Sequence, residues 1–139
     1  MITKIQSFTD VITNSSSTVF VMHERDANYY DKLEHTEGCV DIEPITFEWL
    51  LDNSYEFKMV CELIGCDVSE ISKYIEWKYW SGWNTPNSED WRTFLELHRE
   101  KIEKVFKDLY LVEIEDHFEE AFEVTENAYD DAIWTDYRH

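Results

Sequence analysis

A run of hydroxyl and amide side chains near the start of the sequence has residue types that nucleophilic or anion-binding chemistry uses. A serine nucleophile needs a base that the fold brings close to it, and a phosphate-binding loop normally uses glycine together with lysine. The run has neither glycine nor lysine beside it, so we expect no catalytic residue here. We interpret it as a turn whose short side chains bond their own backbone, with a role that stays open. The run consists of Thr13, Asn14, Ser15, Ser16 and Ser17.

The C-terminal part of the sequence carries many carboxylates and no cation to pair with them. Between Lys107 and Arg138 there is no lysine or arginine. Three interpretations remain open: a solvated surface, a cation site, or a surface that imitates a row of nucleic-acid phosphates and occupies a basic groove on another protein. The D-x-D-x-D-G spacing of a calcium loop is missing, so we expect no metal ligands. The carboxylates that we predict to bind a partner are Glu113, Glu115, Asp116, Glu119, Glu120, Glu123, Glu126, Asp130 and Asp131.

A tryptophan-rich segment lies in the middle of the chain, with Trp77, Trp80, Trp83 and Trp91 close together. Large aromatic side chains either fill a corner between two helices or act as anchors at a protein interface. Stacking on bases is disfavoured because the cationic groups that accompany it are missing. Both interpretations remain open, and on the second we predict that Trp80 and Trp83 contact a partner.

The histidines and cysteines are scattered along the chain. The histidines at positions 23, 35, 98, 117 and 139 do not have zinc-ligand spacing relative to the cysteines at positions 39, 61 and 66. His98 falls among the apolar positions of an expected helix, which indicates a core residue. The cysteines have no C-x-x-C spacing, which favours reduced thiols. We therefore expect neither a metal nor a cofactor.

The overall charge restricts the partners of this protein. The chain has 31 Asp and Glu against 12 Lys and Arg, a net charge of -19 over 139 residues. Such a surface repels nucleic-acid phosphates and anionic lipid, so direct binding to either is disfavoured. No stretch approaches the 18 apolar residues of a membrane span, and the first residues lack a signal-peptide pattern. We expect a cytoplasmic protein whose partner is a basic protein surface.

The elements that must position these side chains begin with strands. Residues 18–22 form a β-branched and aromatic run of strand length, and residues 1–8 have a weaker strand pattern. A short helix is expected over residues 26–35, followed by a brief strand at residues 39–42.

From residue 44 onward the apolar period becomes helical. Thr46 is placed to cap a short helix, and a second helix is expected over residues 54–64, ended by Gly65. A third is expected over residues 68–80. The clearest pattern follows residues 85–87, where apolar side chains recur at steps of three and four as far as residue 109 and predict one long helix.

The last segments return to the sheet. Residues 110–114 alternate as a strand does, whereas residues 117–134 could be a helix lined by Phe122 and Tyr129 or could contain a strand edge. The order of strands, helices and strand predicts an α+β fold: a small sheet from the N-terminal strands and the strand near 110–114, covered by helices from the middle of the chain. No linker or repeat interrupts the chain, so we predict a single domain over residues 1–139.

One short segment resembles a known motif. Residues 10–20, with the sequence D-V-I-T-N-S-S-S-T-V-F, resemble an N-terminal pattern, roughly D-[FV]-[VI]-T-N-S-S-S-x-x-F, of many uncharacterised bacterial and phage proteins. The resemblance covers about eleven residues and brings no established activity with it. It implies a bacterial or phage origin and the cytoplasm of a bacterial host cell.

Charge and resemblance together predict a non-enzymatic protein-binding domain. Its most concrete form is a phage or mobile-element inhibitor that blocks a basic nucleic-acid-binding host defence protein by mimicking nucleic-acid charge, as an anti-CRISPR protein would. Two alternatives remain open. One is a small enzyme or nucleotide-binding protein that uses the T-N-S-S-S turn, and the other is an assembly protein that self-associates through the tryptophan-rich segment.

Overall fold

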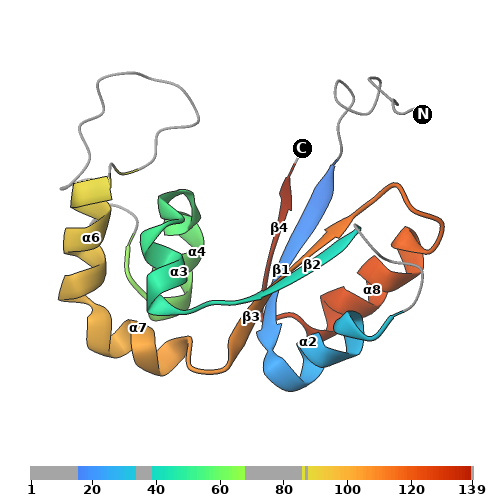
Figure 1. Ribbon diagram of the computed structural model, residues 1–139, viewed down its shortest axis with the longest axis horizontal. Coiled ribbons are helices and arrows are strands. Elements are labelled where there is room, and N and C mark those ends of the chain that lie inside the picture. Colours follow the sequence, from blue (N-terminus) through green and yellow to red (C-terminus); the bar gives the residue numbers. More distant parts are fainter. Residues whose placement is uncertain (1–15, 34–38, 68–85, 87, 139) are drawn as a thin grey trace. The chain divides into compact units, whose positions relative to one another are not determined.

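The protein forms two compact units in the computed structural model, which describes residues 16–33, 39–67, 86 and 88–138 (Figure 1). Unit 1 comprises Met1–Glu43 and Tyr110–His139, and unit 2 comprises Pro44–Leu109. Unit 1 is therefore built from both ends of the sequence, and unit 2 from one continuous segment. The single domain expected over residues 1–139 remains a prediction beside this division.

Unit 1 is organised around a four-stranded antiparallel sheet. Its strands are β1 (Ser17–His23), β2 (Val40–Pro44), β3 (Leu109–Glu115) and β4 (Trp134–Arg138), in the order β2-β3-β1-β4. β1 pairs with β4 in a register that places Ser17 opposite Arg138. The α+β class predicted from the sequence is confirmed, and so are the strands expected at residues 18–22, 39–42 and 110–114. The strand expected at residues 1–8 lies outside the described residues.

Two helices pack on one face of this sheet, α2 (Glu24–Asp31) and α8 (Ala121–Asp131) (Figure 1). They belong to the N-terminal and C-terminal segments, whereas the helices from the middle of the chain lie in unit 2. The segment that was ambiguous in sequence, residues 117–134, is thus a helix followed by the start of β4. The cluster between sheet and helices comprises Phe20, Met22, Ala27, Tyr30, Val112, Ile114, Val124 and Ala128.

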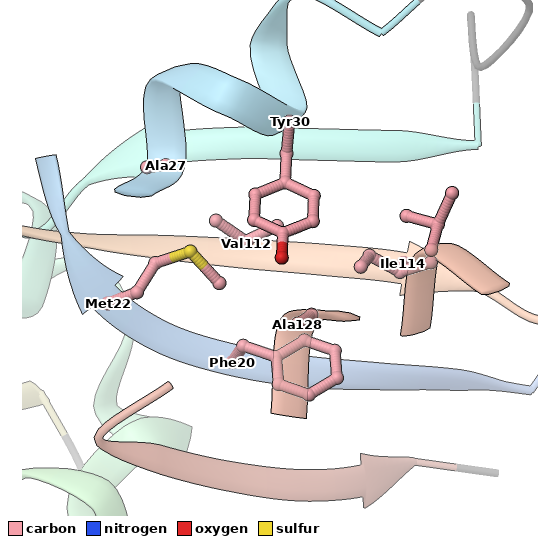
Figure 2. Packing of buried hydrophobic residues seen from close by; sticks show 8 residues of the cluster. Phe20, Met22, Ala27, Tyr30, Val112, Ile114 and Ala128 are labelled. Carbon is pink, nitrogen blue, oxygen red and sulfur yellow. The ribbon is translucent and has the colours of Figure 1, made fainter. Parts of the chain in front are cut away.

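The alternation of side chains along the strands explains this core. Successive residues of a strand point to opposite faces, so Phe20 and Met22 share one face of β1. Figure 2 shows them on the same side as Val112 and Ile114 of β3, with the ring of Tyr30 lying over them from α2. All five are 1% exposed or less. Removing this apolar surface from water is the main term that holds unit 1 together.

The described residues of unit 2 form short helices. They are α3 (Phe47–Leu51), the 3-10 helix η1 (Ser54–Glu56), α4 (Phe57–Ile64), α6 (Ser88–Leu97) and α7 (Arg99–Val105). Thr46 caps α3 as expected, because its hydroxyl accepts a hydrogen bond from the amide of Trp49 at 3.0 Å. Gly65 ends α4 with a φ of 77°, a left-handed conformation that suits glycine.

The long helix predicted after residues 85–87 is two helices that meet at His98. The amide of His98 is shared between the carbonyls of Phe94 and Leu95, both at 3.2 Å, so the last turn of α6 tightens before α7 begins. The apolar steps of three and four continue across this break, which is why periodicity did not reveal it. The helix expected over residues 68–80 lies outside the described residues.

Candidate partner-binding surface

The sequence of α8 fixes which of its sides faces water. Ala121, Val124 and Ala128 are spaced three and four residues apart and are buried against the rest of unit 1. Small side chains at these positions let the helix approach the sheet closely. The opposite side of α8 must then face solvent, and it carries Glu123, Glu126 and Asp130, which are again spaced three and four residues apart.

These carboxylates form a row. Glu119 lies in the turn before α8, four residues ahead of Glu123, and continues the same spacing. All members of this group, Glu119, Glu123, Glu126 and Asp130, are exposed, and we call them the acidic face. Within the described part of the chain, no lysine or arginine forms an ion pair with any of them. Among the described residues, no cationic side chain of the protein therefore offsets their charge.

Two of the other predicted carboxylates serve the fold. Glu113 accepts a hydrogen bond from the Ser17 hydroxyl at 2.6 Å, and Asp131 accepts one from the Tyr30 hydroxyl at 2.8 Å. Burial of Tyr30, and then this hydrogen bond, raise the pKa of its phenol well above its usual range. Both carboxylates thus have partners inside unit 1.

The remaining predicted carboxylates surround the turn that leads into α8. Glu115 lies 3.5 Å from the imidazole of His117. Glu115 also adds to the effect of burial in raising the pKa of the Cys39 thiol. Asp116 and Glu120 are exposed, and the backbone amide of Asp116 donates to the Ser16 carbonyl at 3.1 Å. The predicted carboxylates therefore divide into half-buried hydrogen-bond acceptors and an exposed row with the residues around it.

Exposed aromatic side chains lie beside the acidic face, and sequence reasoning did not place them there. Phe122 is 79% exposed and Tyr129, seven residues later on the same flank of α8, is 49% exposed. The ring of Tyr129 rests edge-on against Phe20, with 5.1 Å between ring centroids. From the apolar pattern, Phe122 and Tyr129 were expected to lie on the apolar side of a helix. The spacing of Ala121, Val124 and Ala128 was the signal for the side that is buried.

A cavity of about 290 Å³ lies along this flank of α8. We call it the flank cavity. Its lining combines apolar and aromatic residues with two acidic residues, and two of the lining residues carry hydroxyl groups. The residues that line it are Asp116, Ala121, Phe122, Thr125, Glu126 and Tyr129.

The serine-rich motif is only partly visible. Thr13, Asn14 and Ser15 lie outside the described residues, as do Trp80 and Trp83 of the tryptophan-rich segment. Ser17 begins β1 and is 6% exposed, and its hydroxyl donates to the carboxylate of Glu113. This hydrogen bond ties two strands together, which gives Ser17 a role in the sheet.

In the described part of unit 2, a thiol and an imidazole lie close together. The Cys66 sulfur lies 4.0 Å from Nε2 of His98, which also packs against the ring of Phe94. His98 is half-buried, whereas its position in the sequence pattern predicted a core residue. Among the residues with described positions, no group of three or more histidine, cysteine, aspartate or glutamate side chains could hold a metal ion.

Comparisons with protein-family models, with curated proteins and with solved structures find no match to this chain. The resemblance of residues 10–20 to bacterial and phage proteins remains an expectation from that motif. In the described ranges, no helix is both long enough and apolar enough to cross a membrane. The geometry of unit 1 is therefore the basis for a functional proposal.

Proposed function

We propose that this protein binds a basic surface of another protein through the acidic face of α8 and the exposed rings of Phe122 and Tyr129 beside it. The observation that carries the proposal is the one-sided composition of α8. Its exposed row is made of carboxylates without basic partners in the described residues, and Phe122 beside that row is 79% exposed. A solubilising surface needs charge, but it does not need an exposed phenylalanine.

The combination of charge and aromatic area suits a protein interface. Aromatic side chains are enriched where binding energy concentrates, because they bury a large area and lose little conformational entropy. Complementary charge around them speeds the encounter and selects the partner. The partner should therefore be rich in lysine and arginine and should offer an apolar contact among them.

The spacing of the acidic face supports a more specific partner, the nucleic-acid-binding groove of a host protein. Glu123, Glu126 and Asp130 span about 10 Å of helix axis at 1.5 Å per residue. One strand of DNA carries about three phosphates over the same length. A groove that binds DNA phosphates with lysine and arginine would meet a similar row of charges on α8. We accordingly propose an inhibitor that occupies such a groove in the bacterial cytoplasm.

The test is retention of bacterial proteins on the immobilised chain, followed by DNA displacement with each purified candidate. Retained proteins are eluted with a salt gradient and identified by mass spectrometry. Each is then bound to a labelled duplex, and release of the duplex by this protein is measured by fluorescence anisotropy. We expect a nucleic-acid-binding protein that elutes at moderate salt and releases its duplex, because the interaction is largely electrostatic.

A matched pair of variants separates the acidic face from general acidity. The first variant neutralises the acidic face with Glu119→Gln, Glu123→Gln, Glu126→Gln and Asp130→Asn. The second makes the same change in net charge at exposed positions of unit 2 with Glu48→Gln, Asp52→Asn, Glu89→Gln and Glu100→Gln. We expect only the first to abolish duplex release. Equal loss in both variants, or no loss in either, would overturn the proposal.

A further inference from the structure

We propose that the flank cavity is a subsite for one arginine side chain of the partner. This inference rests on the proposed function and names the chemical group that α8 recognises. The cavity lies in unit 1 between the exposed rings of Phe122 and Tyr129 and the carboxylates of Asp116 and Glu126, all of which line it. A planar cation on an aliphatic stem matches this lining.

The residues that line the flank cavity favour a guanidinium group over an ammonium group. Arginine places its cation over the faces of aromatic rings, and its guanidinium can donate two parallel hydrogen bonds to a carboxylate. The aliphatic part of its side chain can pack on apolar surface, here the exposed surface of Phe122. A lysine ammonium is more strongly hydrated and lacks the planar fork, so it would satisfy fewer of these groups.

The size and the charge of the flank cavity restrict which chemical groups can occupy it. At about 290 Å³ the flank cavity lies at the small end of ligand sites and has room for one side chain. Carboxylates on its rim and along the adjacent acidic face would repel an anionic ligand. A cation that is also partly apolar is therefore the occupant that both the lining and the surrounding charge favour.

The chain provides an internal control for the role of Glu126. Glu123 is exposed on the same helix, three residues earlier, and belongs to the same acidic face, but it does not line the cavity. Replacing either residue with glutamine removes one negative charge. Long-range attraction for a basic partner falls equally in the two variants, whereas direct contact with a guanidinium is lost only in Glu126→Gln.

The experiment measures binding of two labelled peptides, hexa-arginine and hexa-lysine, by fluorescence anisotropy at low salt. We expect the wild-type chain to bind hexa-arginine at least about threefold more tightly than hexa-lysine. Glu126→Gln should weaken hexa-arginine binding about fivefold, and Glu123→Gln no more than about twofold. Phe122→Ala should remove most of the preference for arginine, and circular dichroism of each variant checks that the fold is retained.

Three outcomes decide the matter. A preference for arginine that depends on Phe122 and Glu126 supports the subsite. Equal binding of both peptides, with equal effects of Glu126→Gln and Glu123→Gln, overturns the subsite and leaves the acidic face as a surface without a defined pocket. No binding of either peptide at low salt overturns the subsite and the proposed function together.

Discussion

The two units of this protein differ sharply in how they use charge. Unit 1 contains 18 Asp and Glu against four Lys and Arg, whereas unit 2 contains 13 against eight. Most of the net charge of -19 therefore belongs to the unit that holds the sheet and α8. Mere solubility would not require such a division, because charge spread over both units would serve equally well.

The geometry of the charges differs as well. In unit 2, Arg99 lies between Glu96 at 3.0 Å and Glu103 at 3.2 Å, and its guanidinium stands 3.9 Å from the ring centroid of Phe47. These contacts link α6, α7 and α3 within unit 2. In unit 1 the acidic face has no such cation in the described residues. Charge in unit 2 makes contacts between its helices, and we propose that charge on α8 serves a partner.

The largest effect that would test this comparison concerns two phenylalanines of unit 1. Phe20→Ala should reduce the free energy of unfolding by about 3–5 kcal/mol, because Phe20 is fully buried in the core cluster. Phe122→Ala should change it by less than about 0.5 kcal/mol, because Phe122 is mostly exposed. Urea denaturation measures both values. A large loss in Phe122→Ala would mean that this ring serves the fold, and the comparison between the units would weaken.

A second prediction concerns the partly buried hydrogen bond between Tyr30 and Asp131 in unit 1 and the dependence of its contribution on pH. Tyr30→Phe should cost about 1.5–3 kcal/mol at pH 7, because it removes the hydrogen bond to the Asp131 carboxylate. The pKa of Tyr30 is raised by burial and by this bond, so the folded state keeps the phenolic proton after the unfolded state has lost it. The stability difference between the two proteins should therefore shrink as pH rises above about 10.

The control for this prediction is the neighbouring residue. Tyr29 is 53% exposed and adjoins Tyr30 in sequence, so Tyr29→Phe should change stability by less than about 0.5 kcal/mol. Urea denaturation at pH 7 and at several values above pH 10 gives the comparison. A constant difference between wild type and Tyr30→Phe over that range would contradict the assigned cause of the pKa shift.

The smallest expected effects are changes in the free energy of unfolding, and these should have opposite signs in the two units. Asp130→Asn should stabilise the protein by about 0.3–1 kcal/mol, because Asp130 lies in the last turn of α8, where a negative charge opposes the helix dipole and repels Glu126. Glu96→Gln should lower the urea midpoint, because the hydrogen bond from Arg99 is weakened. Since that bond lowers the pKa of Glu96, its contribution is present above the ordinary value of 4.5 and is lost on acidification.

Thermal and urea denaturation at low salt measure both variants. High salt should reduce both effects, because the groups involved are exposed. If both substitutions changed stability in the same direction, the inference that the two units use charge differently would be wrong.

The comparison of sequence with structure shows which signals were local. Strands at residues 18–22 and 110–114, the Thr46 cap and the Gly65 stop all follow from side-chain types within a few residues, and the structure has them. At the break, the backbone amide of His98 is shared between two carbonyl groups. A pattern of apolar residues does not reveal this sharing. The division into two units depends on contacts between distant segments and was not visible in composition.

The charge of the candidate surface could be predicted from the sequence, but its geometry could not. The absence of lysine and arginine between Lys107 and Arg138 identified the right stretch of carboxylates for this proposal. Which of them face solvent depends on the rotation of α8 about its axis, and that rotation follows from Val124 and Ala128, which belong to the core cluster. Large aromatic residues had been expected to mark the buried side, so Phe122 and Tyr129 were missed as surface groups.

The pairing of β1 with β4 has a consequence for synthesis on the ribosome. Unit 2 is continuous and can leave the exit tunnel whole, whereas β1 is made early and meets β3 and β4 only after Leu109–Arg138 has been translated. At about 5–20 residues per second, the apolar strand Val19–Met22 waits for on the order of several seconds without its neighbours. During that interval its apolar side chains lack the strands that later cover them, and slowed translation across the segment of unit 2 should lengthen their exposure.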